Sequence, residues 1–165
     1  MFKPDVTFDI VEKLIKISED IIIVIGKPKN RFFNEYIKHY DNDFYEPLSS
    51  RTNLDAFSEK ISSLSTTFVI LYKNEIAGLI ASYFYDKELN NGFITLVHVK
   101  SEYRGLGLSY HLVKTVQSYT KENGFNQVNL VVYKDNISAY KLYTRCGFLV
   151  TSENNGRCNM CWTNK

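Results

Sequence analysis

The sequence has none of the long apolar segments that mark membrane and secreted proteins. The β-branched run from Ile21 to Ile25 is far too short to cross a bilayer, and the segment from Met1 to Asp5 has no signal-peptide core. We therefore expect a cytoplasmic protein without a membrane partner.

Cysteine is scarce, and its spacing does not complete a metal site. Cys158 and Cys161 form a C-x-x-C pair, but the chain has only three cysteines and no second pair for a zinc site. The segment from Arg157 to Thr163 is predicted to be a final strand, on which residues three apart face opposite sides. The two thiols should therefore not meet, and we expect no metal site and a reducing compartment.

An excess of charge of one sign is also absent. Lysine and arginine total 20 against 18 for aspartate and glutamate, a net charge of +2, which argues against a nucleic-acid partner. Hydrophobic residues make up 44% of the 165 residues, which is enough for the core of one domain that spans residues 1–165. The protein is expected to be a monomer or a homodimer.

The segment from Arg104 to Ser109 is the strongest functional signal. It follows an extended apolar run, Phe93 to Val99, and it opens an amphipathic helix. Two glycines at such a turn let the backbone approach a ligand closely, and the free N–H groups of the helix's first turn bind phosphate. A dinucleotide fingerprint would need a third glycine where Tyr110 stands, and a P-loop would need a lysine followed by Ser or Thr. A pyrophosphate held without a metal fits better.

A second motif follows a predicted strand in the C-terminal third of the chain. The pattern N-x-x-A-x-x-x-Y-x-x-x-G-F is matched at every position, by Asn136, Ala139, Tyr143, Gly147 and Phe148. A strand and a helix separate it from the glycine segment, and the two motifs at this spacing form a specific combination.

The two motifs together resemble those of the GNAT superfamily, the acetyl-CoA-dependent N-acetyltransferases. That family carries (Q/R)-x-x-G-x-(G/A), which is matched here by Arg104 and Gly107, with the small residue Ser109 in place of Gly or Ala. The resemblance runs from about Thr67 to Phe148. It divides the chain into an acceptor-side half (1–66), an acetyl-CoA-binding core (67–148) and C-terminal strands (149–165).

The resemblance implies a mixed, mostly antiparallel α/β sheet with splayed central parallel strands, flanked by helices. Hydrophobic periodicity and turn residues predict helices at 8–17, 31–39, 53–64, 107–122 and 136–145. They predict strands at 21–25, 67–72, 75–85, 92–99, 127–132, 148–152 and 157–163.

The resemblance also implies acetyl-CoA as co-substrate, with its pantetheine arm paired like a short strand against the main chain in the splay. One N–H group there would polarise the thioester carbonyl. The cofactor-binding residues implied in this way are Val97, His98, Val99, Arg104, Gly105, Leu106, Gly107, Leu108, Ser109, Asn136, Ala139 and Tyr140.

Tyr143 lies where the family places its general acid, and its hydroxyl can donate to the leaving sulfur. No general base is evident. Alternation along the strand points Val97, Thr95 and Phe93 toward the acetyl group, and it puts His98 on the opposite face unless a bulge intervenes. We therefore expect His98 to be a structural residue with both nitrogens satisfied.

The proton of the amine is then expected to leave through water. The route would reach Tyr83, Tyr85 or a carboxylate from the first half of the chain.

The acceptor pocket is expected to be formed by residues 36–51, the strand end at 83–86 and the last strands. Glu46 could hold an ammonium group, and Arg51 could hold a phosphate or carboxylate. The candidate acceptor-binding residues are Tyr45, Glu46, Arg51, Tyr83 and Thr95.

This composition favours a small-molecule primary amine, such as an amino sugar or sugar nucleotide, as the acceptor. The segment could equally be an ordinary surface loop with a hydrophobic anchor. A protein or peptide acceptor and a non-catalytic CoA-binding module remain alternatives.

Overall fold

The computed structural model describes residues 2–84 and 88–165. Its helices are α1 (Pro4–Thr7), α2 (Asn30–His39), α3 (Leu54–Leu64), α4 (Leu108–Glu122) and α5 (Ile137–Arg145). Its strands are β1 (Phe8–Lys16), β2 (Ile21–Pro28), β3 (Ser65–Tyr72), β4 (Glu75–Tyr83), β5 (Asn91–Val99), β6 (Gln127–Tyr133), β7 (Leu149–Asn154) and β8 (Arg157–Thr163). Short 3-10 helices lie at η1 (Asp41–Asp43), η2 (Leu48–Ser50) and η3 (Ser101–Tyr103).

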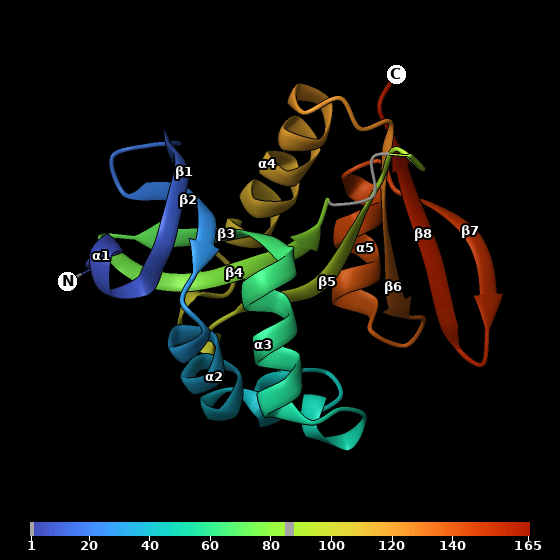
Figure 1. The fold of residues 1–165 in the computed structure, drawn as a ribbon. Coiled ribbons are helices and arrows are strands. Elements are labelled where there is room, and N and C mark those ends of the chain that lie inside the picture. The colour runs from blue at the N-terminus through green and yellow to red at the C-terminus, as the bar shows by residue number, and fades with distance from the viewer. Residues whose placement is uncertain (1, 85–87) are drawn as a thin grey trace.

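The strands of the described residues form one eight-stranded sheet in the order β1-β2-β3-β4-β5-β6-β8-β7 (Figure 1). Neighbouring strands are antiparallel, except that β5 and β6 run parallel. This is the mixed, mostly antiparallel sheet that the family resemblance implied. No helix in the described parts of the chain is long and apolar enough to span a membrane.

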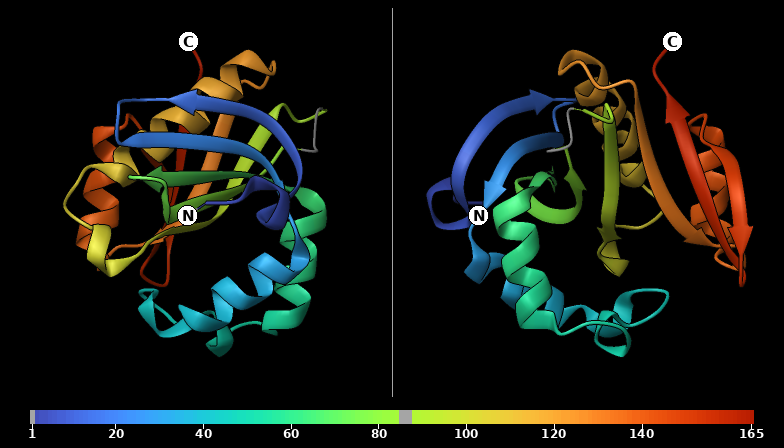
Figure 2. Two further views of the ribbon diagram at one scale, coloured as in Figure 1. Left: turned by 90° about the vertical axis from the view of Figure 1, so that its left-hand side faces the viewer. Right: turned by 45° about the vertical axis from the view of Figure 1, so that its right-hand side comes forward.

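The two parallel strands separate soon after they meet. Their register holds for three pairs, from Asn91↔Gln127 to Phe93↔Asn129, although β5 continues to Val99 and β6 to Tyr133. The right-hand view of Figure 2 shows β5 and β6 diverging toward the bottom of the picture. Among the described residues, no strand pairs with the last part of β5 on the side of β6. The polar main-chain groups on that side are therefore available to another partner.

Helices cover both faces of the sheet (Figure 1). Helices α4 and α5 pack on one face, over a core that includes Phe68, Leu112 and Tyr143. Helices α2 and α3 pack on the other face, where Phe33 and Ile61 are fully buried.

Several local predictions are confirmed. The predicted start of a helix at residue 53 is confirmed, since the Asn53 side chain caps α3 by accepting from the Ala56 N–H at 2.9 Å. Lys73 and Asn74, at the predicted turn between β3 and β4, both have positive φ, as a tight type I′ hairpin turn requires. Cys158 is buried and Cys161 only partly so, in keeping with opposite faces of β8, and both thiols are free. The predicted strand end at residues 85 and 86 lies outside the described residues.

The predicted helix at 8–17 is wrong, because this segment is strand β1. It pairs with β2 along almost its whole length, for example Leu14 with Val24. The helix-like spacing of its apolar residues is explained by irregular strand pairing. The pairing with β2 shifts register after Phe8 and again after Val11, and such bulges destroy the two-residue alternation by which a strand is recognised. In addition, β1 is an edge strand whose side chains are mostly exposed, so its apolar residues do not form a buried stripe.

Candidate active site

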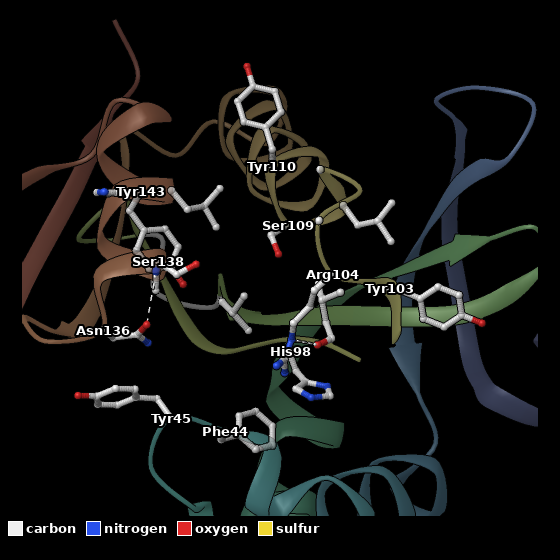
Figure 3. Close-up of a pocket in the computed structure, with 18 of the residues that line it drawn as sticks. Phe44, Tyr45, His98, Tyr103, Arg104, Ser109, Tyr110, Asn136, Ser138 and Tyr143 are labelled. Atoms are coloured by element: carbon white, nitrogen blue, oxygen red, sulfur yellow. Dashed lines mark hydrogen bonds between the residues drawn. The ribbon is translucent and has the colours of Figure 1, made fainter. Parts of the chain in front are cut away.

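The splayed strands open onto a cleft of about 820 Å³, the main cleft. Figure 3 shows Arg104 and His98 on one side of it, Asn136 and Tyr143 on the other, and the start of α4 above. Most of the residues predicted to bind the cofactor line this cleft, as does Tyr143: Val97, His98, Val99, Arg104, Gly105, Gly107, Leu108, Ser109, Asn136, Ala139 and Tyr143. Leu106 and Tyr140 do not line it.

Two glycines shape the loop before α4. Gly105 has φ +83° and Gly107 has φ +75°, in the left-handed region that favours glycine. A Cβ built at either position would meet no atom within 4 Å. Gly107 is the N-cap of the fifteen-residue helix α4. The first turn of α4 borders the main cleft through Leu108 and Ser109. A phosphate group could bind at this loop, because the space is open, the N–H groups of the first turn are unpaired, and the helix dipole favours a negative charge.

The end of β5 presents main-chain groups to the same cleft. The Lys100 N–H donates to the Ala77 carbonyl at 2.8 Å, toward β4. Because main-chain groups alternate in direction along a strand, those of Val99 and Val97 point the other way, into the gap beside β6. This is the direction that an added strand-like ligand needs.

A β-bulge interrupts β5 at Thr95. The register with β4 passes from Leu96 to Ile94 and leaves Thr95 out, and Ile94 packs in the same core as Val97. The strict alternation used to place Phe93 beside Val97 is therefore wrong beyond Leu96, because the inserted residue exchanges the two faces.

His98 lies on the opposite face of β5 with both ring nitrogens satisfied, as predicted. Nδ1 is 2.7 Å from the Tyr36 hydroxyl, Nε2 is 2.7 Å from the Asp43 carboxylate, and the side chain is 2% exposed. Burial lowers the pKa of His98, and the nearby Arg104 partly offsets the opposite effect of Asp43. Burial also raises the pKa of Tyr36. A neutral imidazole follows, with Nε2–H donating to Asp43 and Nδ1 accepting from Tyr36.

The Arg104 side chain is engaged by the same carboxylate. Its Nη2 donates to Asp43 Oδ2 at 2.8 Å, and its Nε donates to the Val99 carbonyl at 3.0 Å. Arg104 therefore links the glycine loop to η1 and to the end of β5.

Helix α5 supplies the facing wall. Asn136 caps it, with Oδ1 accepting from the Ala139 N–H at 3.4 Å. No hydrogen bond to a described residue uses the Asn136 Nδ2 amide group, and Asn136 borders the main cleft.

Tyr143 is buried at the point where the main cleft meets a second cavity. Its ring packs edge-on against Phe148, with centroids 5.8 Å apart. Burial, and to a lesser extent Cys146, raises the pKa of Tyr143. The phenol therefore stays protonated across the neutral and mildly alkaline range, and it can act as a hydrogen-bond donor.

Sequence reasoning missed two cations of the main cleft, Lys141 and Arg145. Among the described residues neither has an ion-pair partner, and the Arg145 guanidinium lies over the Tyr110 ring at 4.9 Å. Their i, i+4 spacing places both on one face of α5, and this was the signal that could have found them. Two unpaired cations suit a ligand with several phosphate groups.

A second cavity of about 150 Å³, the side cavity, adjoins the main cleft. Both are bordered by Phe44, Tyr45, Val97, Asn136, Ala139 and Tyr143. The predicted acceptor residues Tyr45, Glu46, Arg51 and Thr95 line the side cavity. Tyr83 does not, because it packs in the core beneath α2 and α3.

Contacts between the two halves of the chain close one wall of the side cavity. The rings of Tyr45 and Tyr133 lie 5.3 Å apart, the Tyr133 hydroxyl donates to Glu46, and Arg157 Nη2 donates to that hydroxyl at 2.7 Å. Tyr133 was not predicted, although it is the last residue of the strand that leads into the second motif.

Comparisons with known proteins show the fold and the family of this chain. The model of the acetyltransferase (GNAT) family matches residues 32–148. YobR, an uncharacterized N-acetyltransferase of Bacillus subtilis (strain 168), is 32% identical over 66 residues, or 40% of this chain and 27% of that protein. The match thus spans about a quarter of that relative's length.

Two solved structures have the same fold. PaiA N-acetyltransferase from Thermoplasma acidophilum, in complex with coenzyme A, aligns with a TM-score of 0.68 at 14% identity and covers 86% of this chain and 99% of that one. The ribosomal-protein-S18-alanine N-acetyltransferase from Escherichia coli aligns with a TM-score of 0.68 at 16% identity, covering 86% and 93%. The chain therefore belongs to the acetyltransferase (GNAT) family of acetyl-CoA-dependent N-acetyltransferases.

Proposed function

We propose that this protein transfers an acetyl group from acetyl-CoA to the primary amine of a small molecule, such as an amino sugar or sugar nucleotide. The observation that carries the proposal is the junction of two cavities at Tyr143. A large cleft with phosphate-binding features meets a small aromatic cavity that contains a carboxylate and an arginine. Donor and acceptor can therefore meet at one hydroxyl group.

The main cleft would hold acetyl-CoA. Its phosphates would lie on the N–H groups that follow Gly105 and Gly107, near Lys141 and Arg145. Its pantetheine arm would pair with the main-chain groups of Val97 and Val99, as strand addition does. Bound acetyl-CoA supplies a thioester that an amine can attack.

Tyr143 would hold a proton where charge develops on the leaving sulfur. Because its pKa is raised, complete proton transfer to a thiolate with a reference pKa of about 8.5 is unfavourable. Tyr143 therefore acts by hydrogen bonding to that charge.

Glu46 would attract the acceptor's ammonium group, and a water molecule between them would pass the proton to the Glu46 carboxylate. It is the carboxylate of the side cavity, and Tyr133 and Ser50 fix its orientation by donating hydrogen bonds. This agrees with the predicted proton route to a carboxylate of the first half of the chain.

The shape of the side cavity favours a small molecule over a peptide. The contacts of Tyr45 and Glu46 with Tyr133 join the two halves of the chain across the splay, where an extended peptide would otherwise have an open path. The position of Tyr143 at the junction of the two cavities argues against a non-catalytic CoA-binding module. We also propose that the protein acts in the cytoplasm, where three free thiols would stay reduced.

A thiol-release screen tests the proposal. Wild-type protein with acetyl-CoA is offered amino sugars, sugar nucleotides with an amino group, polyamines, amino acids and peptides. We expect turnover with a member of the first two classes. Turnover with peptides alone would show that the acceptor is a peptide and not a small molecule. Acetyl-CoA binding without turnover on any amine would favour the non-catalytic module.

Arg51 is expected to select acceptors that carry an anionic group. It lines the side cavity, and its side chain has no hydrogen-bond or ion-pair partner among the described residues. Arg51→Gln should raise KM for a phosphorylated or carboxylated acceptor about tenfold, since a hydrogen bond to a charged group contributes about 1.5 kcal/mol. KM for a neutral amino sugar should stay unchanged in parallel steady-state assays. An equal rise for both acceptors would remove the anion-binding role.

Asn136 is expected to donate its side-chain amide to the pantetheine arm as well as to cap α5. Asn136→Asp keeps the capping oxygen but loses the donor and adds a negative charge. Acetyl-CoA affinity, measured by calorimetry, should fall about tenfold, the effect of losing one or two kcal/mol, with little change in melting temperature.

Asn53→Asp is the matched control, because Asn53 caps α3 in the same way away from both cavities. That variant should bind acetyl-CoA like the wild type. If Asn136→Asp lowers the melting temperature and spares binding, Asn136 is only a cap.

A further inference from the structure

The glycine loop and the acceptor segment are joined by one ion pair. Arg104 stands at the start of the loop, and Asp43 ends η1, directly before the aromatic residues that line both cavities. Their side chains meet at 2.8 Å, with Asp43 29% exposed and Arg104 51% exposed. Such a partly exposed pair contributes little to stability by itself.

Buried partners fix this pair in place. The same Asp43 oxygen accepts from His98, which is held in turn by Tyr36 of α2. The Phe44 ring lies 4.8 Å from the His98 ring. Arg104 is oriented by its second bond, from Nε to the Val99 carbonyl. All four polar side chains thus have defined partners, as expected for a network that sets one geometry.

The ion pair spans the two places where the substrates would bind. The main chain of Val99 faces the cleft, and the Val99 carbonyl, which accepts from Arg104, has a second lone pair for the pantetheine arm. Asp43 directly precedes Phe44 and Tyr45, which border the side cavity. Moving either end of the pair would shift the acceptor wall relative to the acetyl group.

We infer that Arg104 and Asp43 form a clamp that positions the acceptor segment against the end of β5, so that Arg104 is a positioning residue and not a ligand of the pyrophosphate. The inference rests on the proposed function only where it states an effect on acceptor binding. The phosphates are left to the loop N–H groups, Lys141 and Arg145. Removing the clamp therefore loosens acceptor binding and spares acetyl-CoA.

The clamp predicts that its loss changes KM for the amine but not the Kd of acetyl-CoA. Arg104→Gln and Asp43→Asn should each leave the calorimetric Kd of acetyl-CoA within about threefold, and each should raise KM for the amine about tenfold, in the usual range of coupling between sites. The double variant should be no worse than either single variant, because both changes remove the same contact.

Arg145→Gln is the matched control. It removes the same charge from the facing wall of the main cleft, without touching Asp43. It should weaken acetyl-CoA binding and leave KM for the amine unchanged. The clamp is refuted if Arg104→Gln weakens acetyl-CoA binding tenfold or more while Asp43→Asn does not, because Arg104 would then be a phosphate ligand.

Amide hydrogen exchange tests the clamp without the need for an acceptor. Both clamp variants should speed exchange in residues 41–51 and leave residues 108–122 of α4 unchanged. Unchanged exchange in residues 41–51 would overturn the clamp. If no amine supports turnover in the wild type, the proposed acceptor class fails, while the exchange and calorimetry results still decide the clamp.

Discussion

Replacing Tyr143 with phenylalanine is expected to lower kcat about a hundredfold while the Kd of acetyl-CoA stays nearly unchanged. The hydroxyl is proposed to donate a hydrogen bond to negative charge that exists on sulfur only in the transition state, and the loss of one such donor costs about a hundredfold or more. The ring stays in place against Phe148, so the fold should be kept. Paired steady-state kinetics and calorimetric titration with acetyl-CoA measure the two quantities.

Tyr119→Phe controls for the loss of a phenol hydroxyl in the same core. Tyr119 lies on α4, packed against Phe68 and Phe84, and it lines neither cavity. Its variant should turn over like the wild type. Unchanged turnover in Tyr143→Phe would remove Tyr143 from the mechanism, and a large loss of acetyl-CoA affinity would make it a packing residue.

Replacing Gly107 with aspartate is expected to abolish useful acetyl-CoA binding. The new carboxylate would stand where the phosphates are proposed to lie, and like charges placed together cost several kcal/mol. We expect a loss of affinity of about a hundredfold or more by calorimetry. The positive φ of Gly107 adds strain of about 1–2 kcal/mol to the folded state.

Gly124→Asp separates the strain from the charge. Gly124 has φ +78° and equally open surroundings, but it follows the far end of α4. This variant should lose similar stability and bind acetyl-CoA normally. Equal binding losses in the two variants would mean that strain, and not the position of the charge, weakens binding.

Local sequence signals predicted the conformations of the glycine loop and of the start of α5 well. The glycines before α4 and the cap at Asn136 depend on neighbouring residues, and their conformations follow from turn and capping chemistry. The splay of β5 from β6 followed from resemblance to a family, since no pattern within one strand reports how far its partner diverges.

The segment at residues 41–51 meets the rest of the chain through contacts between distant residues, which the sequence did not predict. The Tyr133–Glu46 contact joins residues 87 positions apart, and the Asp43–Arg104 pair joins residues 61 positions apart. Neither pairing has a local signature. The bulge at Thr95 and the two register shifts in β1 are set by the partner strands, so alternation within one strand could not reveal them.

Amide chemical shifts recorded while acetyl-CoA is titrated into the isotope-labelled protein show whether the splayed strands and the glycine loop form the acetyl-CoA site. The largest shifts should fall on residues 97–99, on residues 104–109 and on the start of α5 at residues 136–139, since most of these residues border the main cleft. The amides of α3 should not move. Saturable binding with its largest shifts elsewhere, or no binding at millimolar acetyl-CoA, would contradict the assignment of the splayed strands and the glycine loop as the acetyl-CoA site.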